Sequence, residues 1–268
     1  MKSAGYIVNR TWRRGFTVQK MLATLCLLLG AQSALCGDFT VGVEAINFYP
    51  LYDGTSAQYQ GYGRDVLDSF ARKYGHRFRY VALPVERLYQ RYFHTASLDF
   101  KFPDNPAWQE QLRGNSGIAY SGPVYRATEG LFVLPTNSRK SLRELGSIST
   151  MRGFGAWPYH TDIANGVITI QFADTLDSLL ALVRSGRAGG VFYEESAINW
   201  QQRQAGLATD QSLVLHEQLP HYHPELFLST RTHPEVIAQF DQFLQEERPL
   251  LQSLKAKYGL YEAHTQQH

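Results

Sequence analysis

Cysteine is nearly absent from this chain of 268 residues, and both copies, Cys26 and Cys36, lie within the first 36 positions. Beyond those positions neither a disulfide framework nor a cysteine metal site can form, so stability there has to come from an apolar core. Apolar residues make up 44% of the chain and charged residues 19%, which is ordinary for a globular protein with such a core.

A hydrophobic run long enough to span a bilayer is also absent. The apolar run from Met21 to Leu35 covers 15 residues, whereas a membrane-spanning helix needs roughly 20. The segment before it is basic and contains no acid, and small residues follow it, so the pattern predicts a cleaved signal peptide over 1–36 and a periplasmic location. An uncleaved N-terminal anchor, export through the twin-arginine route ("WRRGF") and lipidation of Cys36 are the alternatives.

The excess of basic over acidic residues is confined to the first 36 positions. Five of the 26 Lys and Arg residues and none of the 24 Asp and Glu residues fall in 1–36, so 21 basic residues against 24 acidic ones remain after it. No basic stripe survives there to bind nucleic acid, and a nucleic-acid partner is not expected.

Catalytic and cofactor motifs are missing too. The sequence has no Walker A loop, no Rossmann GxGxxG and no nucleophile elbow. His221 and His223 have a spacing compatible with metal binding, but two histidines without a third nearby ligand are a weak signal. We therefore expect no metal, no cofactor and no enzymatic activity.

Short apolar runs alternate with helical patterns from Asp38 onward, which predicts an α/β fold. Strands are expected at 39–45, 77–83, 97–102, 116–121 and 130–135, with helices at 62–75 and from Pro84. The alternation restarts after Pro135, and a long C-terminal helical pattern, 234–259, is interrupted at Pro249. This organisation predicts a signal peptide at 1–36, a first lobe at 37–133, a second lobe at 134–218, and a return to the first lobe at 219–268.

Several stretches resemble the periplasmic solute-binding proteins of family 3, the polar amino-acid receptors. They are "GYGRDVLDSFARKYG", "YSGPVY", "LRELG" and "LLALVRSGRAGGVFYEES", and their order and spacing are more specific than any one of them. The resemblance implies a two-lobed type II periplasmic-binding-protein fold, with mixed sheets and a two-stranded hinge. It also implies a monomer that closes on a small-molecule solute.

One departure from the family pattern concerns the ligand. Amino-acid receptors of this family carry a Thr-x-x-Arg whose arginine holds the ligand carboxylate, whereas here Arg113 in "EQLRGNSGIAYS" sits about one residue off and lacks the threonine. The chain therefore resembles a divergent branch of the family, whose ligand is an amino acid or a related organic anion or zwitterion.

Ligand-binding residues are expected at strand ends and helix starts, where α/β folds bind their ligands. Arg87, one turn into a helix, could bind a carboxylate or phosphate, with a surface ion pair as the alternative. Asp104 could cap the next helix or, like Asn105, contact the ligand, and Trp108 could line the cleft or pack beneath it. The remaining first-lobe candidates are Asn47, Tyr49, Tyr62 and Ser121.

The second lobe adds four candidates. Trp157 and Tyr159 end a strand, and Thr161 is placed to cap a helix whose free N–H groups would suit an anion. Glu194 matches the family position whose acid pairs with a ligand ammonium, and a helix-capping charge is the alternative reading.

Together these features predict an extracytoplasmic solute-binding protein that delivers a small polar solute, an amino acid or related anion or zwitterion, to an inner-membrane ABC permease. A periplasmic sensor feeding a membrane receptor and a dehydratase-like enzyme on the same fold are the alternatives.

Overall fold

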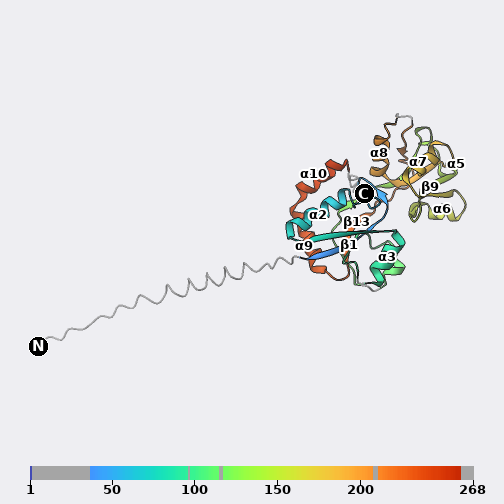
Figure 1. Ribbon diagram of the computed structural model, residues 1–268. Coiled ribbons are helices and arrows are strands. Elements are labelled where there is room, and N and C mark those ends of the chain that lie inside the picture. The colour runs from blue at the N-terminus through green and yellow to red at the C-terminus, as the bar shows by residue number, and fades with distance from the viewer. Residues whose placement is uncertain (2–36, 96, 115–116, 208–210, 261–268) are drawn as a thin grey trace. The chain divides into compact units, whose positions relative to one another are not determined.

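The computed structural model describes residue 1 and residues 37–260 except 96, 115–116 and 208–210 (Figure 1). The predicted signal peptide lies outside the described residues, and its cleavage stays a prediction. Within the described part of the chain every helix is too short or too polar to cross a membrane.

The first lobe is built on a sheet with the strand order β4-β1-β5-β13-β6, to which β7 is added by pairing with β13. Its strands are β1 (Asp38–Glu44), β4 (Arg77–Leu83), β5 (Phe100–Asp104), β6 (Ala119–Tyr120), β7 (Tyr125–Arg126) and β13 (Glu225–Thr230). β1 pairs in parallel with β4 and β5, whereas β13 runs antiparallel to β5. The small hairpin of β2 (Asn47–Phe48) and β3 (Tyr52–Asp53) follows β1.

The helices of this lobe are α2 (Tyr62–Tyr74), α3 (Val85–His94), the short α4 (Glu110–Arg113), α9 (Pro234–Glu246) and α10 (Arg248–Tyr258). Figure 1 shows α2, α9 and α10 grouped beside β1 and β13. The 3.6-residue period of α2 buries Phe70, whose ring lies 5.0 Å from that of Phe240 and 5.7 Å from that of Phe243 on α9. The predicted interruption at Pro249 is confirmed, because it stands in the first turn of α10.

The second lobe has its own sheet, with the order β10-β9-β11-β8-β12. Its strands are β8 (Glu129–Val133), β9 (Ser147–Met151), β10 (Thr169–Ala173), β11 (Gly190–Glu194) and β12 (Val214–Leu215). Its helices are α5 (Leu142–Leu145), α6 (His160–Ala164), α7 (Leu176–Arg184) and α8 (Glu195–Gln204), with one-turn 3-10 segments at η1 (Pro135–Asn137) and η2 (Trp157–Tyr159). The predicted α/β fold with mixed sheets is confirmed.

Two antiparallel chain segments connect the lobes, as the predicted hinge requires. The chain leaves the first sheet after β7, and it returns to that sheet at β13. The Ala127 N–H donates to the Pro224 carbonyl at 2.9 Å, and Glu129 and Tyr222 exchange two backbone hydrogen bonds of 2.8 Å each. These bonds hold the outgoing and returning segments side by side.

The sheet to which β8 belongs differs from the prediction, which set the lobe boundary between 133 and 134 and so assigned β8 to the first lobe. β8 pairs with β11 and β12, so residues 129–133 belong to the second sheet rather than to the first. The stretch carries a clear strand signal, but its partner strands lie some 60 to 80 positions further along, and no local pattern tells which sheet a strand joins. The exact lobe limits therefore remain a proposal based on sheet membership.

Candidate functional site

A cavity of about 450 Å³ opens where strand ends of the two sheets meet, and it is lined by residues of both lobes. That volume falls in the range typical of small-molecule sites. The first lobe contributes the end of β1, the β2–β3 hairpin, α3 and the segment after β5, whereas the second contributes β8, β11 and the loop after β9.

Acidic residues are the only charged residues in this lining among the described residues: Glu44, Glu110, Glu129 and Glu194. Glu44 ends β1 and is 4% exposed, and Glu194 ends β11 and is 1% exposed. Glu129 begins β8 directly opposite Glu194 in the antiparallel pairing of β8 and β11. Directly opposed residues on antiparallel strands have their Cα atoms about 4.5–5.5 Å apart and share a face of the sheet.

The carboxyl groups of Glu44 and Glu194, which are buried, and of Glu129, which is half-buried, all have a raised pKa. Burial, followed by the charges of Glu194 and Glu44, raises the pKa of Glu129 to about 8. Burial raises the pKa of Glu194 to about 7, although hydrogen bonds from Ala197 and Ser196 oppose the shift. Burial also raises the pKa of Glu44, against the opposing charge of Lys101. The cavity therefore holds carboxyl groups whose negative charge lacks full compensation.

The partners of these carboxylates differ. Glu44 accepts a hydrogen bond of 2.6 Å from the Tyr52 hydroxyl. Glu194 caps α8, accepting from the Ala197 N–H at 2.8 Å and from the Ser196 hydroxyl at 2.9 Å. The Glu129 carboxylate has neither a hydrogen bond nor an ion pair with any other described residue. Glu194 thus caps α8, as one of its two readings predicts, and it also lines the cavity, whereas its pairing with a ligand ammonium stays a prediction.

Aromatic rings form most of the remaining wall: Phe48, Tyr52, Tyr89, Trp108, Phe154, Trp157, Phe192, Tyr193 and Tyr222. The ring of Phe48 lies 5.1 Å from that of Tyr193 and 5.7 Å from that of Phe154, so the first-lobe hairpin packs on the second lobe there. The Tyr193 hydroxyl is buried and has no hydrogen-bond partner within the described structure.

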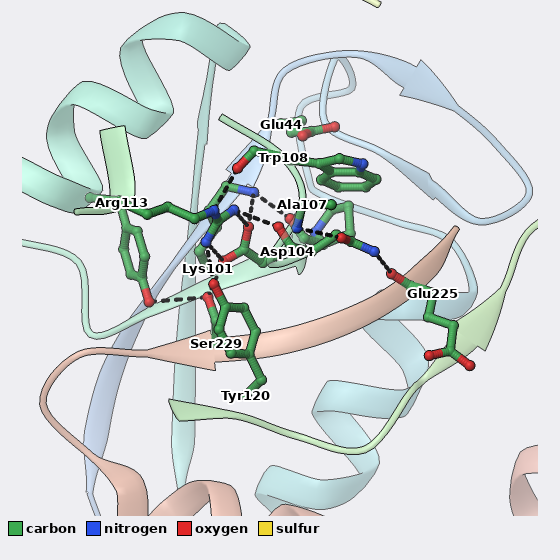
Figure 2. Close-up of polar contacts among 12 residues, drawn as sticks. Glu44, Lys101, Asp104, Ala107, Trp108, Arg113, Tyr120, Glu225 and Ser229 are labelled. Carbon is green, nitrogen blue, oxygen red and sulfur yellow. Dashed lines mark hydrogen bonds and ion pairs between the residues drawn. The ribbon is translucent and has the colours of Figure 1, made fainter. Parts of the chain in front are cut away.

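Behind this wall lies a compensated charge cluster, Lys101, Asp104 and Arg113 (Figure 2). Asp104 is fully buried, with Lys101 Nζ at 3.2 Å and Arg113 Nη2 at 2.7 Å from Oδ1, and it accepts from the Ser229 hydroxyl at 2.7 Å. The two cations hold the pKa of Asp104 below its usual range despite burial. Lys101 Nζ lies 4.3 Å from the Tyr89 ring centroid, so the cluster supports one wall of the cavity.

This cluster corrects two expectations. Asp104 does not cap α4, whose N-cap is Gln109, because its carboxylate is taken up by Lys101 and Arg113. Asn105 lies outside the cavity lining and bonds to the Glu225 carbonyl and the Ala107 N–H. Of the three candidates in this segment, Asp104, Asn105 and Trp108, Trp108 alone lines the cavity.

The structure brings Trp108, Trp157 and Glu194 to the cavity and places the other candidates outside its lining. Arg87 is exposed on α3. Thr161 is exposed within α6, whose N-cap is Tyr159 rather than Thr161, because the one-turn segment η2 runs directly into the helix.

Three candidates, Tyr62, Tyr159 and Ser121, serve local structure instead. The hydroxyl of Tyr62 donates to the Val124 carbonyl, and that of Tyr159 to the Pro220 carbonyl. The Ser121 hydroxyl donates to the Gly122 carbonyl and accepts from the Leu228 N–H.

Asn47 begins β2, and Tyr49 lies on the turn between β2 and β3. Asn47 accepts from the Tyr49 N–H at 3.1 Å, which is a local turn bond. The Tyr49 ring lies 4.7 Å from that of Trp200 on α8. Neither residue lines the cavity.

Glu44 and Glu129 were missed by the sequence analysis. Each is an acid beside an apolar strand, in "TVGVEA" and "TEGLFV", so the strand-end rule that selected Glu194 also covered them. The sequence pattern favoured the aromatic and amide residues nearby as candidates instead.

Solved structures share this fold at low sequence identity. A substrate-binding protein of an ABC uptake transporter from Streptococcus pneumoniae with bound histidine matches with a TM-score of 0.65 and 12% identity, covering 82% of this chain and 92% of that one. The VFT2 domain of BvgS from Bordetella pertussis matches at 0.62 and 18%, covering 90% and 96%. An ancestral amino-acid-binding protein, a precursor of cyclohexadienyl dehydratase, matches at 0.61 and 17%, covering 83% and 95%.

No protein-family model and no curated protein matches the sequence. The structural likeness shows that the chain has the two-lobed fold of type II periplasmic binding proteins, as the sequence resemblance predicted. The solved proteins with which it shares this fold are mainly proteins that bind small molecules, amino acids above all.

Proposed function

We propose that this protein is an extracytoplasmic solute-binding protein whose lobes close on a small polar organic solute and deliver it to an ABC-type permease. The observation that carries the proposal is the cavity of about 450 Å³ shared by both lobes. Two connecting segments with few cross-links allow such lobes to rotate as units, and a ligand that contacts both lobes selects the closed arrangement. The likeness to a substrate-binding protein of an ABC uptake transporter supports this role.

A calorimetric and thermal-shift screen of residues 37–268 tests binding. The panel holds amino acids, organic acids, phosphates and amines. A ligand at 100 times its dissociation constant stabilises the folded state by about 2.7 kcal/mol. For a chain of this size that corresponds to a rise in melting temperature of roughly 5–10 °C. A panel in which no compound shifts the melting temperature would contradict the proposal.

Lobe closure can be followed separately by fluorescence energy transfer. Both native cysteines lie within 1–36, so Arg87→Cys and Arg143→Cys introduce unique labelling sites on exposed helical positions of the two lobes. We expect a ligand-dependent change in transfer efficiency that saturates with the binding isotherm. Binding without such a change would contradict closure.

A periplasmic sensor is the second candidate, favoured by the likeness to a domain of BvgS. A permease and ATPase encoded beside this chain would favour transport, whereas a membrane kinase or cyclase would favour sensing. Co-purification of the liganded protein with the encoded membrane partner decides between them.

A dehydratase-like activity is the third candidate. Glu129 and Glu194, with pKa values of about 8 and 7, are carboxyl groups able to exchange protons near neutral pH, and one similar structure is a dehydratase precursor. We propose binding rather than catalysis, and product formation from a cyclohexadienyl acid by residues 37–268 would contradict this.

A further inference from the structure

The cavity's charges narrow the chemistry of the solute, if the proposed binding function holds. We infer that the cavity binds an organic amine that carries two or more positive charges and no carboxylate, as diamines and polyamines do, between Glu44 of the first lobe and Glu129 and Glu194 of the second.

The first argument is the sign of the charge. Four glutamates and no Lys, Arg or His of the described chain contribute to the lining. Arg113 and Lys101, which lie outside the lining, form ion pairs with Asp104. A ligand carboxylate would therefore enter a negative cavity and find no cationic partner, whereas an ammonium would find several acceptors.

The second argument is the juxtaposition of Glu129 and Glu194. Like charges directly opposite each other on paired strands destabilise a sheet, and burial adds to the cost. Lys101 offsets the charge of Glu44 but does not figure among the groups that act on Glu129. A cation placed between the two strands would offset this repulsion and favour the ionised form of both carboxyl groups.

The third argument is independent of the acids. Tyr193 is 2% exposed and lines the cavity, yet its hydroxyl has no partner within the described structure. Buried hydroxyls are nearly always hydrogen-bonded, so an orphan in a cavity wall points to a bond supplied by a ligand. The charges of Glu194, Glu129 and Glu44 all act on this hydroxyl, which places it beside the acids. It can accept from an ammonium N–H.

The walls suit the same ligand. Tyr52, Tyr89, Trp108 and Tyr193 line the cavity, and aromatic rings attract ammonium groups and cover alkyl chains. Lys101 already lies over the Tyr89 ring from behind, at 4.3 Å from its centroid. A bare metal ion is a poorer occupant, because no three acidic, histidine or cysteine residues of the described chain are grouped closely enough to hold one.

The position of the acids also links this ligand to closure. Glu44 lies on the first lobe and Glu129 and Glu194 on the second, so a ligand with an amine at each end would bind both lobes at once. A monoamine would satisfy only one side. We therefore expect affinity to increase with a second amino group.

The decisive experiment compares ligands that differ only by a carboxylate. Calorimetric titration of residues 37–268 with cadaverine and lysine, and with agmatine and arginine, is expected to give at least tenfold tighter binding for cadaverine and agmatine. Equal affinity, or tighter binding of lysine or arginine, would overturn the inference.

A pair of adjacent glutamates gives matched variants. Glu129→Gln, which breaks no hydrogen bond of the described structure, is expected to weaken cadaverine binding at least tenfold, and its circular dichroism reports folding. Glu195→Gln, one residue past Glu194 and outside the lining, is the control and should change affinity less than threefold. Unchanged cadaverine affinity in folded Glu129→Gln would overturn the inference.

The outcomes also separate the two proposals. Closure on an organic acid or a zwitterion, with no response to cadaverine or spermidine, would leave the solute-binding function standing and overturn the amine inference. Absence of binding across the entire panel would overturn both.

Discussion

The two buried charge clusters of this protein lie close together but are built in opposite ways. In the Lys101–Asp104–Arg113 cluster, a fully buried carboxylate has two cationic partners and a hydroxyl donor. In the cavity, Glu129 and Glu194 oppose each other across a strand pair without a cation. The compensated cluster stabilises the first lobe, and the uncompensated one is a place where a ligand can supply the missing charge.

Removing the carboxylate of the compensated cluster should have the largest effect on stability. Asp104→Ala leaves Lys101 and Arg113 buried without their anion, and we expect a loss of about 3–5 kcal/mol in the free energy of unfolding. Urea denaturation measures it. Asp174→Ala, which breaks the exposed pair with Arg152, is the control and should cost less than about 1 kcal/mol. Equal losses would contradict the distinction between buried and exposed pairs.

Replacing Glu129, an acid of the uncompensated cluster, should raise the free energy of unfolding, whereas replacing Asp104 lowers it. Glu129 binds a proton in the folded state up to about pH 8 but in the unfolded state only to about pH 4.5, so folded-state stability falls as the pH rises between these values. Each unit of such a shift is worth about 1.4 kcal/mol, and Glu129→Gln should therefore be more stable than the wild type by about 1–3 kcal/mol at pH 8.5.

Melting temperatures between pH 5 and pH 9 measure this effect, and Glu195→Gln provides the baseline. The slope should flatten only in Glu129→Gln. The ionisable side chains around Glu129 are Glu44, Glu194, Tyr193, Tyr222, His221 and His223. An unchanged slope would assign the pH dependence to these neighbours.

A smaller effect is expected at the orphan hydroxyl. Tyr193→Phe removes a buried donor that has no partner in the described structure, so the stability of the unliganded protein should stay within about 0.5 kcal/mol or rise. Binding of the cationic ligand should weaken by about fivefold, which corresponds to one ordinary hydrogen bond of about 1 kcal/mol. Calorimetry and thermal melts on the same sample give both values. A destabilised Tyr193→Phe variant with unchanged ligand affinity would contradict this prediction and show that the Tyr193 hydroxyl supports the fold rather than the ligand.

The smallest effect is expected at Arg87. Its guanidinium is exposed on α3 and outside the cavity lining, so Arg87→Ala should change neither ligand affinity by more than twofold nor stability by more than about 0.5 kcal/mol. A large loss of affinity would restore the carboxylate-binding role that the sequence suggested for this arginine.

Much of the architecture could be predicted from local patterns. The strand at 77–83 and the helix from 62 were placed at their observed positions, because apolar residues recur there with the period of each element. Gly75 has a φ of 75° and caps the C-terminus of α2, at the position where the sequence predicts the end of this helix. The break at Pro249 and the capping position of Glu194 also follow from residue chemistry near at hand.

The site was predicted only in part. Glu194 ends β11, Trp108 and Trp157 lie on the segments that follow β5 and β9, and all three line the cavity. Asp104 stands at a strand end as well, but Ser229 of β13 and Arg113 of α4 take up its carboxylate. A rule about strand ends finds the edge of the sheet where ligands bind, and it does not tell which side chains on that edge are already paired.

Local sequence thus defined the alternating elements, the two-lobed class and the strand ends at which a site could form. The tertiary structure decided which charges were compensated. The Ser229 hydroxyl reaches the Asp104 carboxylate 125 positions away, because β13 pairs with β5, and Glu194 faces Glu129, 65 positions away, because β11 pairs with β8. Burial then gave each unpaired carboxylate its raised pKa, and so turned an acidic residue beside a strand into a candidate binding group for an organic cation.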